Sequence, residues 1–128
     1  MKVTKRKFSE LSNKVIGAAI EVHKILGPGL LESTYQRCLV HELKLLNIHV
    51  EEEFPLPVEY KDISLDCGYR IDLLIDNQII VELKSVEQLK SIHEAQLLTY
   101  MKLANIKQGF LINFNVVLLK DGLKSFIL

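Results

Sequence analysis

The sequence lacks the features that mark secreted, membrane-spanning and cysteine-rich proteins. It contains no tryptophan and only two cysteines, Cys38 and Cys67, whose spacing fits neither a disulfide framework nor a zinc site. Cys38 falls on an apolar helical stripe, so we expect buried free thiols in a reducing compartment. No apolar run approaches the roughly 18 residues of a membrane span, and the N-terminal MKVTKRKFSEL lacks the apolar core of a signal peptide. We therefore expect a cytoplasmic protein that does not enter a membrane.

The chain also lacks an excess of either charge, because 16 Lys and Arg residues balance 16 Asp and Glu residues. Proteins that coat nucleic acid without regard to sequence usually carry a basic excess, so this function is disfavoured, although a local basic groove is compatible with the composition. Hydrophobic residues make up 48% of the 128 residues, which is ordinary for a soluble globular protein. A chain of this length can bury about two-thirds of its unfolded surface. We expect one domain over residues 1–128.

The hydrophobic pattern indicates a succession of helices and strands without a linker or an internal repeat. Helical spacing of apolar residues is found over about 9–26, 30–46 and 87–104. Strands are expected over 48–60, 63–75, 79–84 and 109–114, and a final hairpin over 116–128 that turns at Asp121-Gly122. Pro55 and Pro57 should keep the first strand at a sheet edge or bulged. The order α-α-β-β-β-α-β-β predicts an α+β fold, similar to an α/β/α sandwich, with one mixed, mostly antiparallel sheet.

Two apolar runs around a polar turn, YRIDLLIDNQIIVELKS over residues 69–85, indicate a β-hairpin that four charges interrupt. If residues 76–78 form a three-residue loop, Ile75 pairs with Ile79, and all four charges lie on one face. The facing pairs are then Asp72 with Glu82 and Arg70 with Lys84. The other face becomes an unbroken apolar surface of Ile71, Leu73, Ile75, Ile79, Val81 and Leu83. A two-residue loop would bury some of the charges in the core, so the pattern favours the longer loop.

This register would place Asp72 and Glu82 about 5 Å apart at Cβ. At that distance two ionised carboxylates repel each other by roughly 3 kcal/mol at an effective dielectric constant of 20. One carboxylate could take a proton, Arg70 and Lys84 could form ion pairs with the acids, or a divalent cation could bind between them. A solvated cluster of ion pairs is the structural alternative to a functional site.

A third acid, Glu32, lies within the apolar stripe of the second predicted helix. At 100° per residue it clusters with Tyr35, Leu39, Leu43 and Leu46. Its place in the first helical turn would also suit the helix dipole, so a capping role is the structural alternative. A buried acid costs several kcal/mol unless it is paired or bound to a metal, and we therefore favour a functional role.

The third predicted helix carries His93, Gln96 and Tyr100 at i, i+3 and i+7, which places them on one face. Packing in the core accounts for Tyr100. A glutamine among apolar neighbours needs a hydrogen-bond partner, so Gln96 is less well explained by packing.

Taken together, these residues resemble a known pattern. Asp72, followed by Glu82-Leu83-Lys84 on the adjoining strand, is similar to the catalytic signature of the PD-(D/E)XK nuclease superfamily, and the element order resembles its restriction-endonuclease-like core. The segment GLLESTY, residues 29–35, resembles the motif that names the GxxExxY protein family. The segments EVHKILGPGLLESTY, HEAQLLTYMKLANIKQGFLINF and LKDGLKSFIL extend the resemblance over nearly the whole chain. Ile71 stands where the signature has a proline, a common substitution in the superfamily.

The resemblance implies a role for each candidate residue. The ligands of a Mg²⁺ or Mn²⁺ ion would be Asp72, Glu82, the Leu83 carbonyl and Glu32. Lys84 would be the catalytic lysine. The segment from Gln96 to Tyr100 resembles the Q-x-x-x-Y motif of the RecB-like branch, which supports the site and contacts nucleic acid. We add Arg70, which could reach a phosphate, and His93, which shares the face of Gln96.

Three functional hypotheses follow from these observations. The first is metal-dependent hydrolysis of phosphodiester bonds in DNA or RNA. The second is a catalytically inactive module that keeps the nuclease scaffold and binds nucleic acid or protein, which the zero net charge favours. The third is a purely structural ion network. A homodimer in which terminal strands pair across a two-fold axis is also compatible with the sequence.

Overall fold

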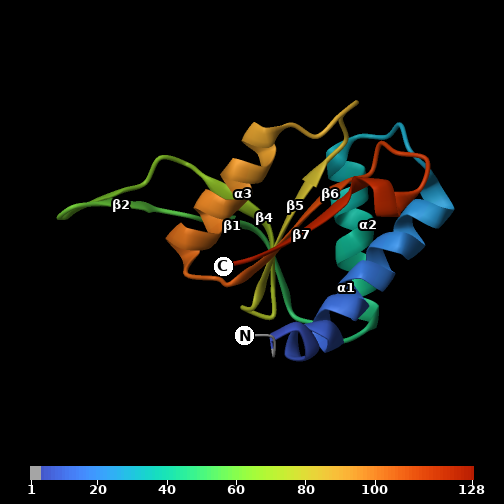
Figure 1. Cartoon of the computed structure of the whole chain (residues 1–128), viewed down its shortest axis with the longest axis horizontal. Helices are drawn as coiled ribbons and strands as arrows, with labels where there is room; N and C mark the ends of the chain where they lie inside the picture. Colours follow the sequence, from blue (N-terminus) through green and yellow to red (C-terminus); the bar gives the residue numbers. More distant parts are fainter. Residues whose placement is uncertain (1–3) are drawn as a thin grey trace.

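The computed structural model describes residues 4–128, with only the backbone described for residues 4–9. Residues 1–3 of the N-terminal segment considered above lie outside the described residues. The helices are α1 (Thr4–Leu26), α2 (Glu32–Leu45), α3 (Ser91–Ala104) and the 3-10 helix η1 (Leu119–Gly122). The strands are β1 (Val50–Pro55), β2 (Val58–Tyr60), β3 (Ile63–Leu65), β4 (Arg70–Ile75), β5 (Ile79–Lys84), β6 (Gln108–Asn113) and β7 (Leu123–Ile127) (Figure 1).

Five of these strands form one sheet in the order β1-β4-β5-β6-β7. β5 and β6 are parallel because α3 connects them as a crossover helix, whereas the other neighbouring pairs are antiparallel. Helices α1 and α2 cover one face of the sheet, and α3 covers the other (Figure 1). The predicted α+β fold with a mixed, mostly antiparallel sheet is confirmed.

Each face of the sheet has its own apolar core. The core beneath α1 and α2 includes Tyr35, Leu39, Leu43, Leu73, Val81, Phe110, Ile112 and Phe114. The core beneath α3 includes Leu74, Ile80, Leu97, Tyr100, Met101 and Leu111. Burying one such aliphatic side chain contributes about 1.5–3 kcal/mol. The central strands are therefore held from both sides, and the polar residues on them have fixed positions.

The hairpin of β4 and β5 has the predicted register, because Ile75 pairs with Ile79 across the loop of residues 76–78. Asp76 and Asn77 have positive φ angles of 49° and 55°. Asp and Asn tolerate the left-handed conformation better than most residues, which explains their place in this loop.

The prediction for Ile71 was wrong. Ile71 lies in the core beneath α3, whereas Leu73 and Ile75 lie in the core beneath α1 and α2. Regular pairing of β4 with β5 ends at Leu73 and Val81. Beyond that point the strict alternation of faces is not maintained.

The two longest predicted strands are each divided in two. Residues 48–60 form β1 and β2, and residues 63–75 form β3 and β4; β2 and β3 pair as a separate two-stranded ribbon. The break after β1 falls at Pro57, which has no amide hydrogen for a ladder bond, and the break before β4 falls at Gly68, whose φ is 80°. β1 lies at the edge of the main sheet, as its prolines predicted.

The predicted terminal hairpin over 116–128 was also wrong. Residues 119–122 form η1, and β7 pairs with β6 instead of with a strand on its own side of the turn. β7 thereby becomes the second edge strand of the sheet. The homodimer in which terminal strands pair stays a prediction. Helix α3 begins at Ser91 rather than at Glu87. Asn113 hydrogen-bonds both backbone groups of Val86, which anchors the segment before the helix to the end of β6.

Both cysteines are free thiols, as predicted, but neither is fully buried. Cys38 is half-buried, and Cys67 is exposed because it lies in the loop between β3 and β4. Within residues 4–128 there is no helix with the length and apolar character needed to cross a bilayer. The cytoplasmic location stays a prediction.

Candidate functional site

The acid pair lies on adjacent strands, where the regular β4–β5 ladder ends. The amide N–H of Asp72 donates to Oε2 of Glu82 at 2.9 Å, and the amide N–H of Leu83 donates to Oδ2 of Asp72 at 2.8 Å. The two carboxylates thus act as acceptors between the strands in place of backbone carbonyls. Each acid is anchored to the neighbouring strand, so the pair has a defined geometry.

Each carboxylate also has a second oxygen that these bonds do not use. Among residues 10–128, no polar side-chain atom is buried without a hydrogen-bond partner. Neither Oδ1 of Asp72 nor Oε1 of Glu82 is therefore buried without a hydrogen-bond partner. Both oxygens are candidate ligand atoms, because the inter-strand hydrogen bonds leave them unused.

Burial disfavours ionisation of this pair. Only 6% of Glu82 is exposed, and desolvation, followed by the negative charge of Asp72, raises the pKa of Glu82 from 4.5 to about 8. Desolvation also raises the pKa of Asp72 from 3.8 to about 6, although the hydrogen bond from Leu83 acts in the opposite direction. A cation between the two carboxylates would favour their ionised forms.

Neither basic neighbour forms an ion pair with these acids. Within residues 10–128, the ion pairs shorter than 4.0 Å are His49–Glu51 and Lys124–Glu94. Lys84 is half-buried and close enough to lower the pKa of both acids. Arg70 is exposed, and its Nη1 donates to the carbonyl of Tyr69 at 3.0 Å. The described residues therefore do not form the salt-bridged cluster that was the structural alternative.

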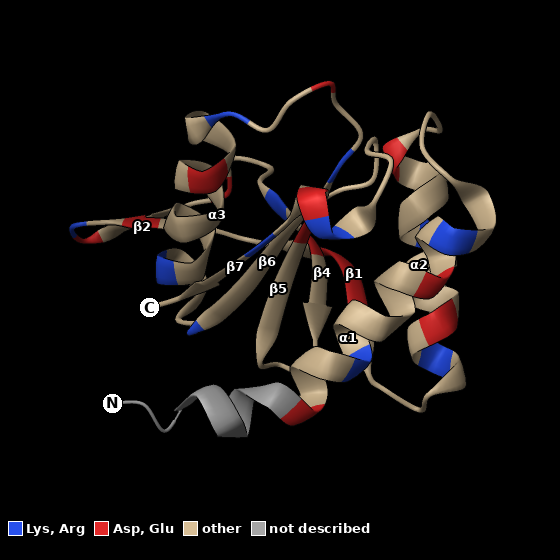
Figure 2. Ribbon diagram, turned by 45° about the vertical axis from the view of Figure 1, so that its right-hand side comes forward, with Lys and Arg blue, Asp and Glu red and all other residues tan. Residues whose placement is uncertain are grey.

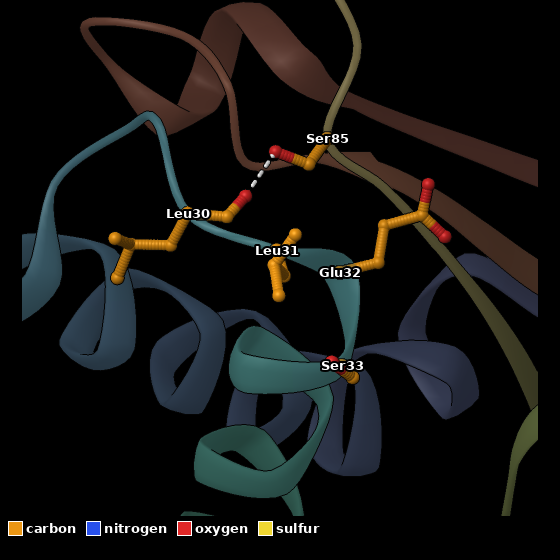
Figure 3. Close-up of a pocket in the computed structure, with 5 residues that line it drawn as sticks. All are labelled: Leu30, Leu31, Glu32, Ser33 and Ser85. Carbon is orange, nitrogen blue, oxygen red and sulfur yellow. Dashed lines mark hydrogen bonds between the residues drawn. The ribbon is translucent and has the colours of Figure 1, made fainter.

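Glu32 is the first residue of α2, and its side chain is exposed. The expectation of burial was wrong because the buried stripe of α2 begins one turn later, at Tyr35. The charge of Glu32 nevertheless raises the pKa of Asp72, so Glu32 lies within electrostatic reach of the acid pair. Figure 3 shows its side chain extending from the start of α2 toward β5. The third acid thus faces the same region from a different element.

The α3 side of the acid pair is lined by Tyr100, which is 8% exposed. Desolvation raises the pKa of Tyr100, and so does the charge of Glu82, so the two groups lie within electrostatic reach of each other. Nε2 of Gln96 donates to the hydroxyl of Tyr100 at 3.3 Å. The expectation that Gln96 lies among apolar neighbours was wrong, because its side chain is exposed. Tyr69 is a further neighbour, with its ring centroid 6.3 Å from that of Tyr100.

His93 contacts the N-terminus of α3 and has no described contact with the acid pair. Its Nδ1 accepts a hydrogen bond from the amide N–H of Lys90 at 3.0 Å, and this bond caps the N-terminus of α3. Capping accounts for His93 without a substrate, and its role in supporting the site stays a prediction.

A comparison with protein families agrees with this geometry. The family model described as the PD-(D/E)XK nuclease superfamily matches residues 9–126. The chain belongs to this superfamily. No match was found among curated proteins or among solved structures. The narrower resemblance to the GxxExxY family stays a prediction.

In this member of the superfamily, a fourth acid that the sequence analysis missed also lies near the pair. Glu53 lies on β1 between Glu52 and Phe54, whose β4 partners Leu73 and Ile71 flank Asp72. It has a φ of 49°, and its charge raises the pKa of both Asp72 and Glu82. Nε2 of Gln36 on α2 donates to Oε2 of Glu53 at 2.9 Å. In the sequence Glu53 is one of three consecutive glutamates, and only the pairing of β1 with β4 distinguishes it from its neighbours.

The donor atoms of the superfamily site suit a hard divalent cation, since Mg²⁺ and Mn²⁺ prefer carboxylate and carbonyl oxygens. Among residues 10–128 the two anchored carboxylates have no basic partner within 4.0 Å, and each keeps one oxygen that the inter-strand bonds do not use, which fits such an ion. Among residues 10–128, no three His, Cys, Asp or Glu side chains are gathered closely enough to form a ligand set. The assembled part of the site is the pair Asp72–Glu82, and Glu32 lies further out.

Proposed function

We propose that this protein is a divalent-metal-dependent nuclease that hydrolyses phosphodiester bonds in DNA or RNA. The observation that carries the proposal is the pair Asp72–Glu82, two hydrogen-bonded carboxylates whose burial raises both pKa values and which have no ion-pair partner among residues 10–128. A protein maintains such an unfavourable pair more readily when a ligand compensates for it. Membership of the nuclease superfamily supports the same function.

In this proposal Asp72, Glu82 and the Leu83 carbonyl hold Mg²⁺ or Mn²⁺, and Glu32 contributes through a water molecule. Such an ion, when bound, lowers the pKa of water and stabilises charge on phosphate oxygens. The amide hydrogen bonds to Asp72 and Glu82 fix both carboxylates beforehand, so little reorganisation accompanies binding. The exposed position of Glu32 suits contact through water.

Lys84 follows Glu82 by two residues on β5, which places both side chains on the same side of the strand. Its ammonium group would orient or help to deprotonate the attacking water and would offset negative charge on the phosphate. The Lys84 backbone is fixed, because its carbonyl accepts a hydrogen bond from the amide N–H of Phe114 at 2.9 Å. Arg70, exposed at the start of β4, would contact a phosphate.

Gln96 and Tyr100 would support the acid pair from α3. Tyr100 is a hydrogen-bond donor beside Glu82, and Gln96 fixes the direction of its hydroxyl. Such indirect contacts orient ligands without touching the ion. His93, at the start of the same helix, would act at a greater distance by fixing the helix terminus.

The direct test is cleavage of labelled single- and double-stranded DNA and RNA by the purified protein with Mn²⁺. Activity should disappear with a chelator and in Asp72→Asn and Lys84→Ala. Lys61→Ala is the matched control, because Lys61 is exposed in the β2–β3 ribbon with its Nζ 5.5 Å from the Tyr60 ring centroid. Wild-type protein that binds Mn²⁺ and leaves every one of these substrates intact would contradict the proposal.

The second candidate is a catalytically inactive module that binds nucleic acid or protein. The zero net charge favours it, and Figure 2 shows Lys and Arg distributed over helices, strands and loops instead of gathered on one element. Calorimetric titration with Mn²⁺ separates the two candidates. The nuclease should bind the ion and lose binding in Glu82→Gln, whereas an inactive module should show no heat of binding in either protein.

A further inference from the structure

The short loop between α1 and α2, residues 27–31, connects the first helix to Glu32. Gly27 and Gly29 have φ angles of 71° and 97°, a region that side chains with a Cβ rarely occupy. The sequence therefore permits a sharp turn here. Glycine also leaves the backbone mobile unless other groups hold it, so the question is which contacts fix the loop.

Tyr35 holds this loop from within the protein. Its side chain is fully buried, and its ring stacks on Phe114 with a centroid distance of 4.5 Å and an interplanar angle of 8°. Its hydroxyl donates to the carbonyl of Gly27 at 2.6 Å and accepts from the amide N–H of Leu30 at 3.1 Å. One buried hydroxyl thus bonds both ends of the turn.

Ser85 holds the same loop from the strand side. Its Oγ donates to the carbonyl of Leu30 at 2.6 Å, as the dashed line in Figure 3 shows. Leu30 therefore has its amide bonded to Tyr35 and its carbonyl bonded to Ser85. Ser85 directly follows Lys84, so these bonds join the start of α2 to the end of β5 where the lysine lies.

The joined elements also line a cavity of about 350 Å³, formed by Leu30, Leu31, Glu32, Ser33 and Ser85. Glu32 extends over this region toward β5 (Figure 3). Glu32 is exposed and does not belong to a closely gathered set of possible ligands. Contacts of its own side chain therefore do not fix its position. The backbone that presents it must do so.

From these contacts we propose that Tyr35 is a positioning residue: its hydroxyl fixes the 27–31 loop against Ser85 and thereby sets the distance of Glu32 from Asp72 and Glu82. The inference rests on the proposed function, because it assigns Glu32 to the cation site. A phenylalanine at position 35 keeps the stacking on Phe114 but leaves the Gly27 carbonyl and the Leu30 amide without this partner.

The test compares Tyr35→Phe, Ser85→Ala and Glu32→Gln with the wild-type protein. Tyr60→Phe is the matched control for loss of a hydroxyl, since Tyr60 is exposed on β2. Ile79→Val controls for general destabilisation, since it shortens a buried side chain at the other end of β5. Two properties are measured besides cleavage: the hydrogen-exchange rate of the Leu30 amide and the dissociation constant for Mn²⁺ by calorimetry.

We expect Tyr35→Phe to accelerate exchange of the Leu30 amide and to raise the dissociation constant for Mn²⁺ about tenfold, the effect of losing one group that orients a ligand. Ser85→Ala should act in the same direction, and neither control should change the affinity. In the Glu32→Gln background, Tyr35→Phe should change the affinity by less than about twofold, because two groups that act through one path are not additive.

Two results would overturn the inference. The first is that Tyr35→Phe binds Mn²⁺ with the affinity of the wild-type protein although its Leu30 amide exchanges faster. The second is that Tyr35→Phe loses the same affinity in the Glu32→Gln background as in the wild-type background. Absence of Mn²⁺ binding by the wild-type protein has a different meaning, because it overturns the proposed function together with this inference.

Discussion

Replacing Glu82 by glutamine should stabilise the metal-free protein while abolishing its response to metal. Glu82 is 6% exposed, and desolvation raises its pKa from 4.5 to about 8. A group whose pKa is higher in the folded than in the unfolded state stabilises the fold at low pH, and this contribution is lost as pH rises through the folded pKa. Glutamine has no charge to desolvate, and its amide oxygen can still accept the hydrogen bond from the Asp72 amide.

The size of the effect follows from the shift in pKa. A rise from 4.5 to about 8, at about 1.4 kcal/mol per pH unit, sets an upper limit of about 5 kcal/mol on the free energy of unfolding that ionised Glu82 removes at high pH. Part of this shift comes from the charge of Asp72 and not from burial, and local relaxation reduces the cost further. We therefore expect a gain of roughly 1–3 kcal/mol for Glu82→Gln at pH 8, which corresponds to a melting temperature about 4–12 °C higher for a domain of this size.

The assay is thermal and urea unfolding at pH 5 and pH 8 with a chelator, repeated with Mn²⁺. Wild-type protein should gain stability from Mn²⁺, by about 2.7 kcal/mol at a hundredfold excess over the dissociation constant, whereas Glu82→Gln should not. Glu59→Gln, an exposed acid on β2, is the control. The reasoning is refuted if metal-free Glu82→Gln is less stable than the wild-type protein at pH 8.

Three further predictions concern the surroundings of the acid pair. The free energy of unfolding of metal-free wild-type protein should fall between about pH 4.5 and pH 8, because both acids have raised pKa values; a rise over this range in urea titrations would contradict the assignment. Glu53→Gln should lower the pKa of both acids, since its charge raises them, and a carboxylate NMR titration measures this directly. Asn113→Ala should cost about 1–3 kcal/mol in chemical unfolding, because Asn113 is 2% exposed and is the partner of both Val86 backbone groups. The Asn113→Ala variant should also reduce cleavage more than Ile79→Val does, because the segment after Lys84 loses its anchor.

Local patterns predicted the parts of the fold that depend on neighbouring residues. Alternation along residues 69–85 and the length of the loop sufficed for the Ile75–Ile79 register, and that register placed Asp72 beside Glu82. Helical periodicity sufficed for α1 and α2, because each buries one regular stripe. Where several elements meet, the same reasoning failed. Ile71 lies in the core beneath α3, at the point where the two carboxylates take the place of the backbone hydrogen bonds between β4 and β5. β7 pairs with β6 and not with the segment that precedes η1.

The sequence by itself determined the acid pair, since two residues on a hairpin are brought together by period-two alternation and a short loop. Only the tertiary structure decided which other groups join them. Glu53 comes from an edge strand, Tyr100 from a crossover helix, and Glu32 from a helix whose start is fixed by Tyr35 and Ser85. These contacts join different helices and strands, with Ser85 and Leu30 55 positions apart in the chain. Their geometry is set by packing of two cores against the sheet, which no local pattern encodes.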